Sequence, residues 1–322
     1  MDVPGPRSAA ERNAGYPVPL AKMLPKPVYY VLAGGGAHGS VQWGALQALA
    51  QTDLAPDFIM GTSAGALSGS ILAEDPESGV ARLAYVWAQL DMSYLVGDKW
   101  WSKGITQVRS RSLVGNAIEA ATLNSILQTE KIEDLSVPFA AVATDLASGR
   151  PHVFDNGPLV PALLASSAIP GVLPPVEIAG RPYCDGLASA NLPAVPAVQR
   201  GAASIVVLDT GARQAVETAK TPARVLSRVG GIMAASQRRR QLREAATRVP
   251  VLLLPTPDDL GGSLEFSDTM RSAAATYSMT RAFLADLSLQ YKRRLPVGLY
   301  ARPDDHGLSD DLQPLLKSVV AS

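Results

Sequence analysis

The chain has 322 residues, of which 47% are hydrophobic and 18% are charged, with 29 basic and 29 acidic side chains. The formal net charge of zero offers no basic field for nucleic acid or an acidic membrane, and a single cysteine, Cys184, excludes a disulfide framework. No apolar run reaches the roughly 20 residues that cross a bilayer, and the first residues lack the pattern of a signal peptide. We therefore expect a cytoplasmic protein with a sizeable core.

Expected strands alternate with expected helices along the chain, which favours an α/β fold with a largely parallel sheet. Residues 1–27 are rich in proline and are expected to be a disordered or wrapping lead-in. The expected strands are 28–32, 58–60, 137–144, 204–208 and 251–254, with a return strand to Phe154 after a turn at Gly149 and a hairpin over 176–184 that turns at Ala179-Gly180.

The expected helices follow the apolar periodicity of the segments between these strands. They are 41–51, 66–73, 79–90, 123–127, 159–167, 191–199, 221–248 and 268–290. Residues 91–121 have no clear period and stand where a cap could cover a site. We expect one domain over residues 28–300, followed by a C-terminal tail over residues 301–322.

The pentapeptide Gly61-Thr62-Ser63-Ala64-Gly65 lies between an expected strand and a helix of small residues. In this setting Gly-x-Ser-x-Gly indicates a nucleophile elbow, a strained turn that needs small residues on both sides of its serine. Ser63 would then lie at a helix N-terminus, where free N–H groups favour developing negative charge. A tightly packed turn without a catalytic role is the alternative interpretation.

The run Gly34-Gly35-Gly36 follows the first expected strand and opens a helix. Its backbone N–H groups could hold a phosphate or the oxyanion of a tetrahedral intermediate. Gly34, Gly36 and Gly39 also match the Gly-x-Gly-x-x-Gly spacing of dinucleotide-binding folds, with Asp53 or Asp57 as the acidic partner. The Gly-Lys-Ser/Thr of a P-loop is absent from this run.

A serine nucleophile needs a base, and the chain has three histidines, His38, His152 and His306. Ser63, Asp185 and His306 follow the chain order of α/β-hydrolase triads, but the polar surroundings of His306 are typical of a solvated turn. A two-residue arrangement fits better, in which Asp185 accepts the Ser63 proton and gives it to the leaving group. A partly dry pocket would raise the pKa of this aspartate from its usual ~3.9.

Three motifs together resemble the signatures of patatin-like phospholipases: Gly34-Gly35-Gly36-Ala37-x-Gly39, Gly61-Thr62-Ser63-Ala64-Gly65 and Asp185-Gly186. Three further stretches are similar: Ala143-Thr144-Asp145-Leu146 with Gly149, Ala165 to Gly171, and Asp185 to Asn191-x-Pro193. The resemblance covers roughly residues 28–210, in order and with suitable spacing.

The resemblance implies a three-layer sandwich, with a largely parallel central sheet between helices. It implies a catalytic dyad of Ser63 and Asp185, and an oxyanion hole in the backbone of Gly34, Gly35 and Gly36. It implies hydrolysis of fatty acyl esters, as in phospholipases, lysophospholipases and esterases, without a cofactor or metal. The implied partner is a lipid or other acyl ester, with possible peripheral contact to a membrane.

Two positions depart from the family pattern, because His38 replaces its usual arginine and Leu187 a frequent glycine. The missing arginine bears on phospholipid specificity more than on hydrolysis. These departures leave room for a catalytically weak, lipid-binding regulatory protein, and the same acyl-enzyme could also serve an acyltransferase.

Several lesser features have structural interpretations. Trp100 and Trp101 could meet an acyl chain or simply pack against the core. The run Arg238-Arg239-Arg240 with Arg243 is expected to be a solvated helix face, with lipid headgroups as the alternative. Cys184 is expected to be a small buried residue, Asp145 a turn residue outside the catalytic set, and Asn191 the cap of the following helix.

Overall fold

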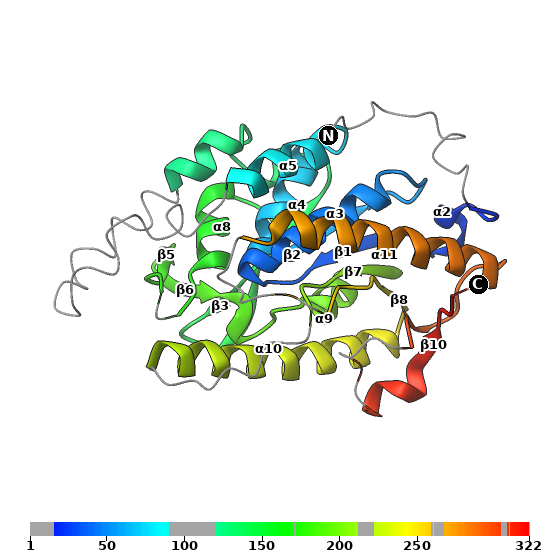
Figure 1. The fold of residues 1–322 in the computed structure, drawn as a ribbon. Helices are drawn as coiled ribbons and strands as arrows, with labels where there is room; N and C mark the ends of the chain where they lie inside the picture. Colours follow the sequence, from blue (N-terminus) through cyan, green and yellow to red (C-terminus); the bar gives the residue numbers. More distant parts are fainter. Residues whose placement is uncertain are drawn as a thin grey trace.

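The structure is a computed structural model that describes residues 16–89, 120–170, 172–211, 222–258, 260, 267–303, 308 and 310–321. Its centre is a mostly parallel ten-stranded sheet with helices on both faces (Figure 1), as the sequence predicts. Across the sheet the strands are β10 (Leu316–Ser318), β9 (Gly298–Ala301), β8 (Pro250–Leu253), β7 (Ser204–Leu208), β1 (Val28–Leu32), β2 (Phe58–Thr62), β3 (Phe139–Asp145), β6 (Arg181–Asp185) and β5 (Val176–Ile178), and β4 (Arg150–Phe154) pairs with β3.

The two faces of the sheet have separate cores because side chains alternate along each strand. In β1, Tyr30 and Leu32 pack into one core, and Tyr29 and Val31 into the other. The first core is covered by α3 (Gly39–Leu49), α4 (Ala64–Glu74), α5 (Gly79–Gln89), α8 (Leu159–Ser167) and α11 (Thr269–Gln290), and the second by α9 (Ala194–Gln199) and α10 (Pro222–Ala246).

Segments before and after the expected domain also pack into this fold. Leu20 and Met23 of the short helix α2 (Leu20–Met23) are buried in the first core. At the other end, β9 and β10 extend the sheet, so residues 316–318 of the expected tail form an edge strand. The part of the suggested cap over 91–119, with Trp100 and Trp101, and also His306 lie outside the described residues.

β3 carries two strands along one of its edges. β4 pairs antiparallel with residues 141–145 of β3, and this stretch includes residues that also pair with β2 and residues that also pair with β6. A strand has only two edges, so β4 lies along one edge of β3, and β2 and β6 share the other edge. The parallel strand β2 ends opposite Val142, and the antiparallel strand β6 ends opposite Ala143. The C-terminal ends of β2 and β6 therefore meet head to head, and this brings Ser63 and Asp185 together.

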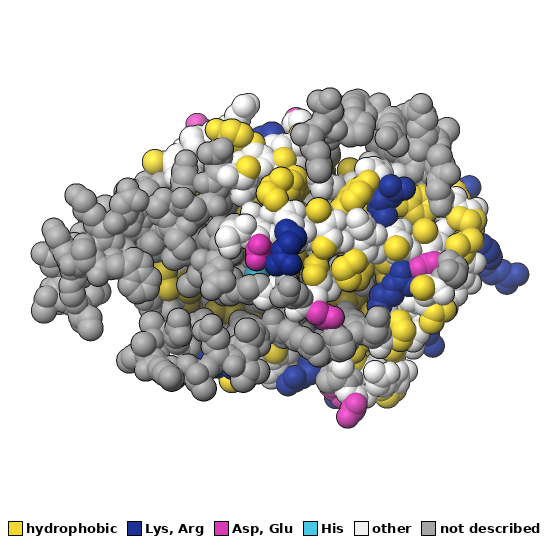
Figure 2. Space-filling model, in the orientation of Figure 1, with side chains coloured by type: hydrophobic (Ala, Val, Ile, Leu, Met, Phe, Trp, Pro, Cys, Tyr) yellow, Lys and Arg dark blue, Asp and Glu magenta, His cyan; other side chains and the backbone are white. Residues whose placement is uncertain are grey.

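Neither the charge on the face drawn in Figure 2 nor the character of the described helices singles out one element. On the face drawn in Figure 2, basic side chains lie in several separate places with acidic ones among them. None of the helices in the described ranges combines the length and the apolar character that crossing a bilayer requires.

Candidate active site

Ser63 occupies a strained turn between β2 and α4. Its φ is 54° and its ψ is −125°, and Ala179 is the only other non-glycine residue with positive φ in the described chain. A Cβ atom on Gly61 would lie 2.3 Å from the carbonyl oxygen of Gly65, and one on Gly65 would lie 2.5 Å from that of Leu32. Only glycine fits at these two positions, and the elbow geometry that the sequence predicts is present.

A buried hydroxyl ties the elbow to the sheet. The backbone N–H of Ser63 donates to Oγ of Ser166 at 2.8 Å, and this hydroxyl donates to the carbonyl oxygen of Val142 at 2.7 Å. Ser166 lies on α8 and is completely buried. It belongs to the stretch Ala165 to Gly171, whose role the sequence did not reveal because the contact spans distant parts of the chain.

Asp185 ends β6 and lies next to the nucleophile. Its side chain is 1% exposed, and Oδ1 accepts a hydrogen bond from the backbone N–H of Leu187 at 2.7 Å. Burial raises the pKa of this carboxyl to about 6, although the hydrogen bonds from Leu187 and from the Ser63 hydroxyl favour the ionised form. A carboxylate of this pKa is a better proton acceptor near neutral pH than a free aspartate.

The glycine loop lies against the nucleophile. A Cβ atom on Gly34 would be 3.2 Å from Cβ of Ser63 and 2.5 Å from Oδ1 of Asn191. The carbonyl oxygen of Gly34 accepts hydrogen bonds from Nδ2 of Asn191 at 3.0 Å and from Oγ1 of Thr210 at 2.9 Å. The N–H of Gly34 donates to the carbonyl oxygen of Asn191 at 2.9 Å. Gly34 is therefore held through both its backbone N–H and its carbonyl oxygen.

The same contacts orient the next N–H group. Because a trans peptide is planar, the N–H of Gly35 points away from the side on which Gly34 presents its carbonyl oxygen to Asn191 and Thr210. Within the described chain, no acceptor is hydrogen-bonded to the N–H of Gly35 or of Gly36. Oriented donors without an internal partner are what an oxyanion hole requires.

Consecutive residues of α10 support the two residues that hold Gly34. Oε1 of Gln237 accepts from the backbone N–H of Asn191 at 3.1 Å, and its Nε2 donates to the carbonyl oxygens of Leu187 at 3.1 Å and Ala188 at 2.9 Å. Arg238 forms a buried ion pair with Asp209, the residue before Thr210.

These contacts correct two predictions. Asn191 does not cap a helix, since α9 begins at Ala194 without a side-chain cap. Arg238 is not solvated, because it turns inward from the exposed neighbours Arg239 and Arg240 to meet Asp209. Both residues act over long distances in sequence, which local patterns do not show.

Two other predictions about single residues are confirmed. Asp145 is a turn residue, because its Oδ1 accepts from the N–H of Ala147 at 2.9 Å and its Oδ2 pairs with Arg181. Cys184 is a buried residue whose pKa is raised by burial.

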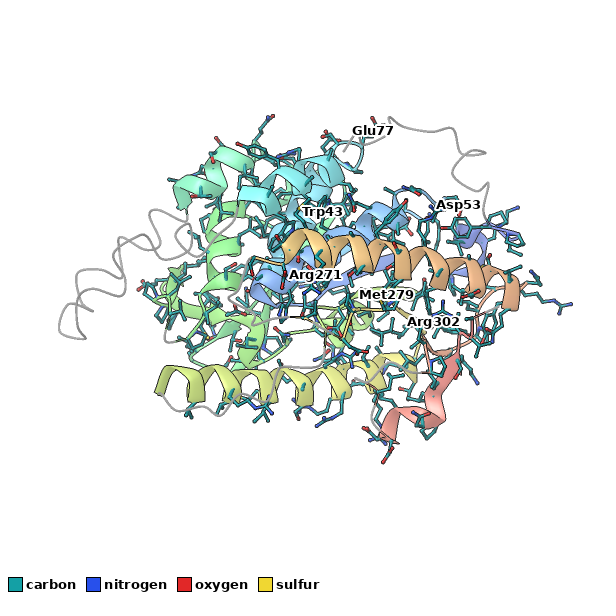
Figure 3. All side chains as sticks on the ribbon, in the orientation of Figure 1. Trp43, Asp53, Glu77, Arg271, Met279 and Arg302 are labelled. Carbon is teal, nitrogen blue, oxygen red and sulfur yellow. The ribbon has the colours of Figure 1, made fainter. Side chains whose placement is uncertain are left out.

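The structure places the acidic residues of the dinucleotide interpretation away from the glycine loop. Oδ2 of Asp57 accepts from the N–H of Val28 at 2.8 Å, where β1 begins, whereas the glycines follow the end of β1. Asp53 accepts from the N–H of Ala21 and lies at the same far end of the sheet (Figure 3). Neither carboxylate could reach a ribose bound at the glycines, so this interpretation is wrong.

The two described histidines differ in position. His152 lies on β4, where its ring packs against Phe154 and Tyr183, with centroid distances of 4.4 and 5.0 Å, and burial lowers its pKa. His38 ends the short helix that follows the glycine loop and is half-buried. Within the described chain, the ionisable side chain that interacts with the Ser63 hydroxyl is the carboxyl of Asp185.

Comparisons with known proteins agree with the motifs. A family model described as patatin-like phospholipase matches residues 30–198, more than half of the chain. Mouse patatin-like phospholipase domain-containing protein 7 is 31% identical over 207 residues, and human patatin-like phospholipase domain-containing protein 6 is 31% identical over 198 residues. Each alignment covers 60% of this chain but only 14% of the relative.

A bacterial relative and a solved structure are also similar. An uncharacterized NTE family protein of Mycobacterium tuberculosis, Rv1063c, is 34% identical over 182 residues, which are 52% of this chain and 45% of the relative. The crystal structure of VipD from Legionella pneumophila has a TM-score of 0.49 and 15% identity, covering 82% of this chain and 67% of that chain. The present chain thus spans less than half the length of these curated relatives.

Proposed function

Because the chain belongs to the patatin-like phospholipase family, we propose that it is a serine acyl hydrolase that cleaves fatty acyl esters through Ser63 and Asp185. Family membership supports a lipid hydrolase. The observation that carries the finer proposal is the meeting of the C-terminal ends of β2 and β6 on β3, which places Ser63 next to the buried Asp185 carboxyl, beside a glycine loop with unused N–H donors.

The proposed reaction has two steps that share an acyl-enzyme. Oγ of Ser63 attacks the ester carbonyl while Asp185 accepts its proton, and the N–H groups of Gly35 and Gly36 bind the oxyanion. Asp185 then gives the proton to the leaving alcohol. In the second step Asp185 takes a proton from water, which attacks the acyl-enzyme, and then gives this proton to Oγ of Ser63 as the bond to the acyl group breaks and the fatty acid leaves. Transfer of the acyl group to another acceptor would use the same first step.

The test is intact-mass analysis after treatment with a fluorophosphonate, which reports an activated serine without assuming a substrate. We expect one adduct on the wild type, none on Ser63→Ala and slower labelling of Asp185→Asn. Ser125→Ala is a matched control that should label like the wild type. Among the described residues, the Ser125 hydroxyl bonds only to the carbonyl oxygen of Thr122, in a short helix outside the elbow.

Two outcomes would contradict the proposal. Labelling of Ser63→Ala at the wild-type rate would show that another serine is the nucleophile. Absence of labelling on folded protein, both in buffer and with detergent micelles, would favour a lipid-binding protein without turnover. A metal chelator should not change the rate of hydrolysis of a soluble ester, because in the proposed steps Asp185 transfers the protons and the backbone N–H groups of Gly35 and Gly36 bind the oxyanion.

A further inference from the structure

The outward face of α10 carries an apolar stripe over its first half. Its four side chains have the spacing i, i+4, i+7 and i+8, which places them on one side of a helix. The buried residues Leu242 and Ala245 belong to the opposite side. The stripe, named here the α10 stripe, consists of Val225, Val229, Ile232 and Met233, which are 47%, 45%, 55% and 42% exposed.

The second half of the same face carries positive charge. Arg239, Arg240 and Arg243 are exposed, and no ion pair among the described residues involves them. The nearest carboxylate in the helix, Glu244, is bonded to Arg248 at 2.9 Å. Although the whole chain is formally neutral, this end of α10 exposes three arginines that form no ion pair within the described residues.

The apolar half of α10 lies beside the candidate active site. Nε2 of Gln237 donates to the carbonyl oxygen of Leu187, and a Cβ atom on Gly230 would lie 3.4 Å from Cδ2 of the same leucine. The N–H of Leu187 in turn donates to Asp185. Figure 1 shows the first turns of α10 below β3 and β6, at the end of the sheet where the dyad lies.

We propose that this face of α10 docks the protein on an anionic lipid surface, an inference that rests on the proposed lipid hydrolase function. The α10 stripe enters the boundary of the acyl chains, and Arg239, Arg240 and Arg243 bind headgroup phosphates. This orientation brings the end of the sheet that holds Ser63 and Asp185 close to the lipid that carries the ester.

A bilayer fits this face better than a second copy of the chain. In a two-fold contact between two α10 helices, arginines would meet either arginines or the apolar stripe, and neither arrangement compensates their charge. An anionic bilayer supplies apolar chains and phosphates within a few ångströms of each other. An anionic bilayer therefore matches both the apolar stripe and the arginines of this face.

The test is sedimentation of the full chain with vesicles, comparing phosphatidylcholine alone with a mixture of phosphatidylcholine and phosphatidylglycerol. We expect binding to the anionic vesicles that weakens with added salt. Ile232→Asp/Met233→Asp should lose at least about tenfold in vesicle affinity, since two charges replace inserted apolar groups. Arg239→Glu/Arg240→Glu/Arg243→Glu should lose the preference for anionic vesicles.

Matched controls lie elsewhere on the surface. Met279→Asp changes an exposed methionine of α11, which covers the other face of the sheet (Figure 3), and Arg293→Glu/Arg294→Glu reverses two exposed charges. Both should bind vesicles like the wild type. Denaturant midpoints near that of the wild type would show that every variant is folded.

Three results would overturn the docking proposal: no vesicle binding by the wild type, binding by the stripe variant at wild-type affinity, or a dimer that the stripe variant abolishes without any vesicle binding. Light scattering distinguishes the last case. Fluorophosphonate labelling in buffer tests the hydrolase separately. Labelling without vesicle binding rejects only the docking surface, whereas vesicle binding without labelling rejects only the proposed catalysis.

Discussion

Asn191 and Gly34 are bonded to each other in both directions. The carbonyl oxygen of Asn191 accepts from the N–H of Gly34, and Nδ2 of Asn191 donates to the carbonyl oxygen of Gly34. With Thr210 as a second donor to this oxygen, the peptide between Gly34 and Gly35 has one available orientation. Asn191 and Thr210 are therefore positioning residues for the proposed oxyanion hole, rather than groups that touch the substrate.

We expect Thr210→Val, which keeps the side-chain shape and removes the hydroxyl, to lower kcat for a soluble ester by about tenfold while KM changes little. Loss of a complete oxyanion donor costs about 10²–10³ in kcat, and a misoriented donor should cost less. Thr210→Ser should restore most of kcat because it keeps the donor. Steady-state kinetics decide this, and a wild-type kcat in Thr210→Val would show that the hydroxyl does not position the loop.

The raised pKa of Asp185 predicts an acid limb in the activity profile. The proposed base must be ionised, and burial raises its pKa to about 6, so kcat/KM should fall below about pH 6 as the carboxylate is protonated. The profile should be flat above this pH until another group titrates. A limb at the ordinary aspartate value, about pH 4, would show that the free enzyme does not use this buried carboxyl as its base.

The same carboxyl should make the free energy of unfolding depend on pH. Its pKa is higher in the folded chain than in the unfolded chain, so the folded state binds the proton more tightly between these values. Stability should therefore fall by about 3 kcal/mol as the pH rises from about 4 to above 6, before other groups are counted. Urea unfolding of Asp185→Asn should lack this component, and equal pH dependence in both proteins would refute it.

The buried ion pair between Arg238 and Asp209 should matter for stability. Arg238→Met leaves the Asp209 carboxylate buried without its partner, and removing one member of a buried pair typically costs about 3–5 kcal/mol. Arg239→Met changes the next residue of the same helix, which is exposed, and should stay within about 0.5 kcal/mol of the wild type. Chemical denaturation compares the two, and similar midpoints would mean that the pair contributes little.

Ser166→Ala should test how the elbow is held. The substitution removes the acceptor of the Ser63 N–H and the donor to Val142, and both backbone groups are buried. We expect a loss of about 1–3 kcal/mol in stability for the unsatisfied groups, with slower fluorophosphonate labelling because Ser63 is less firmly placed. Ser167→Ala is the neighbouring control on α8. Unchanged labelling and stability in Ser166→Ala would show that the turn is rigid without this contact.

The sequence predicts the parts of the fold that depend on local pattern. The buried strand Val28–Leu32, the hairpin turn at Ala179-Gly180 and the helix Leu159–Ser167 all lie where the sequence places them. The elbow is also local, because its glycines and its serine lie within five residues. Short edge strands such as β10 escaped prediction, because three residues with mixed polarity show no clear alternation.

The supports of the site could not be predicted, because each is a contact between distant segments. An asparagine followed by Leu-Pro resembles a helix cap, and nothing local shows that its amide reaches Gly34. Likewise, a run of three arginines suggests a solvated face. Only the rotation of about 100° per residue turns Arg238 inward to an aspartate at the end of β7.

Because β2 and β6 meet on one edge of β3, insertions in the loop after β3 and insertions within β3 should affect the dyad differently. The loop between β3 and β4 can grow or shrink without moving the dyad, because the residues of β3 that pair with β2 and β6 all lie before this loop. One residue inserted between Val142 and Ala143 would instead separate Ser63 from Asp185 by about 3.3 Å and turn the rest of β3 over. Chains that keep this chemistry should therefore differ freely in that loop and conserve the number of residues in this one strand.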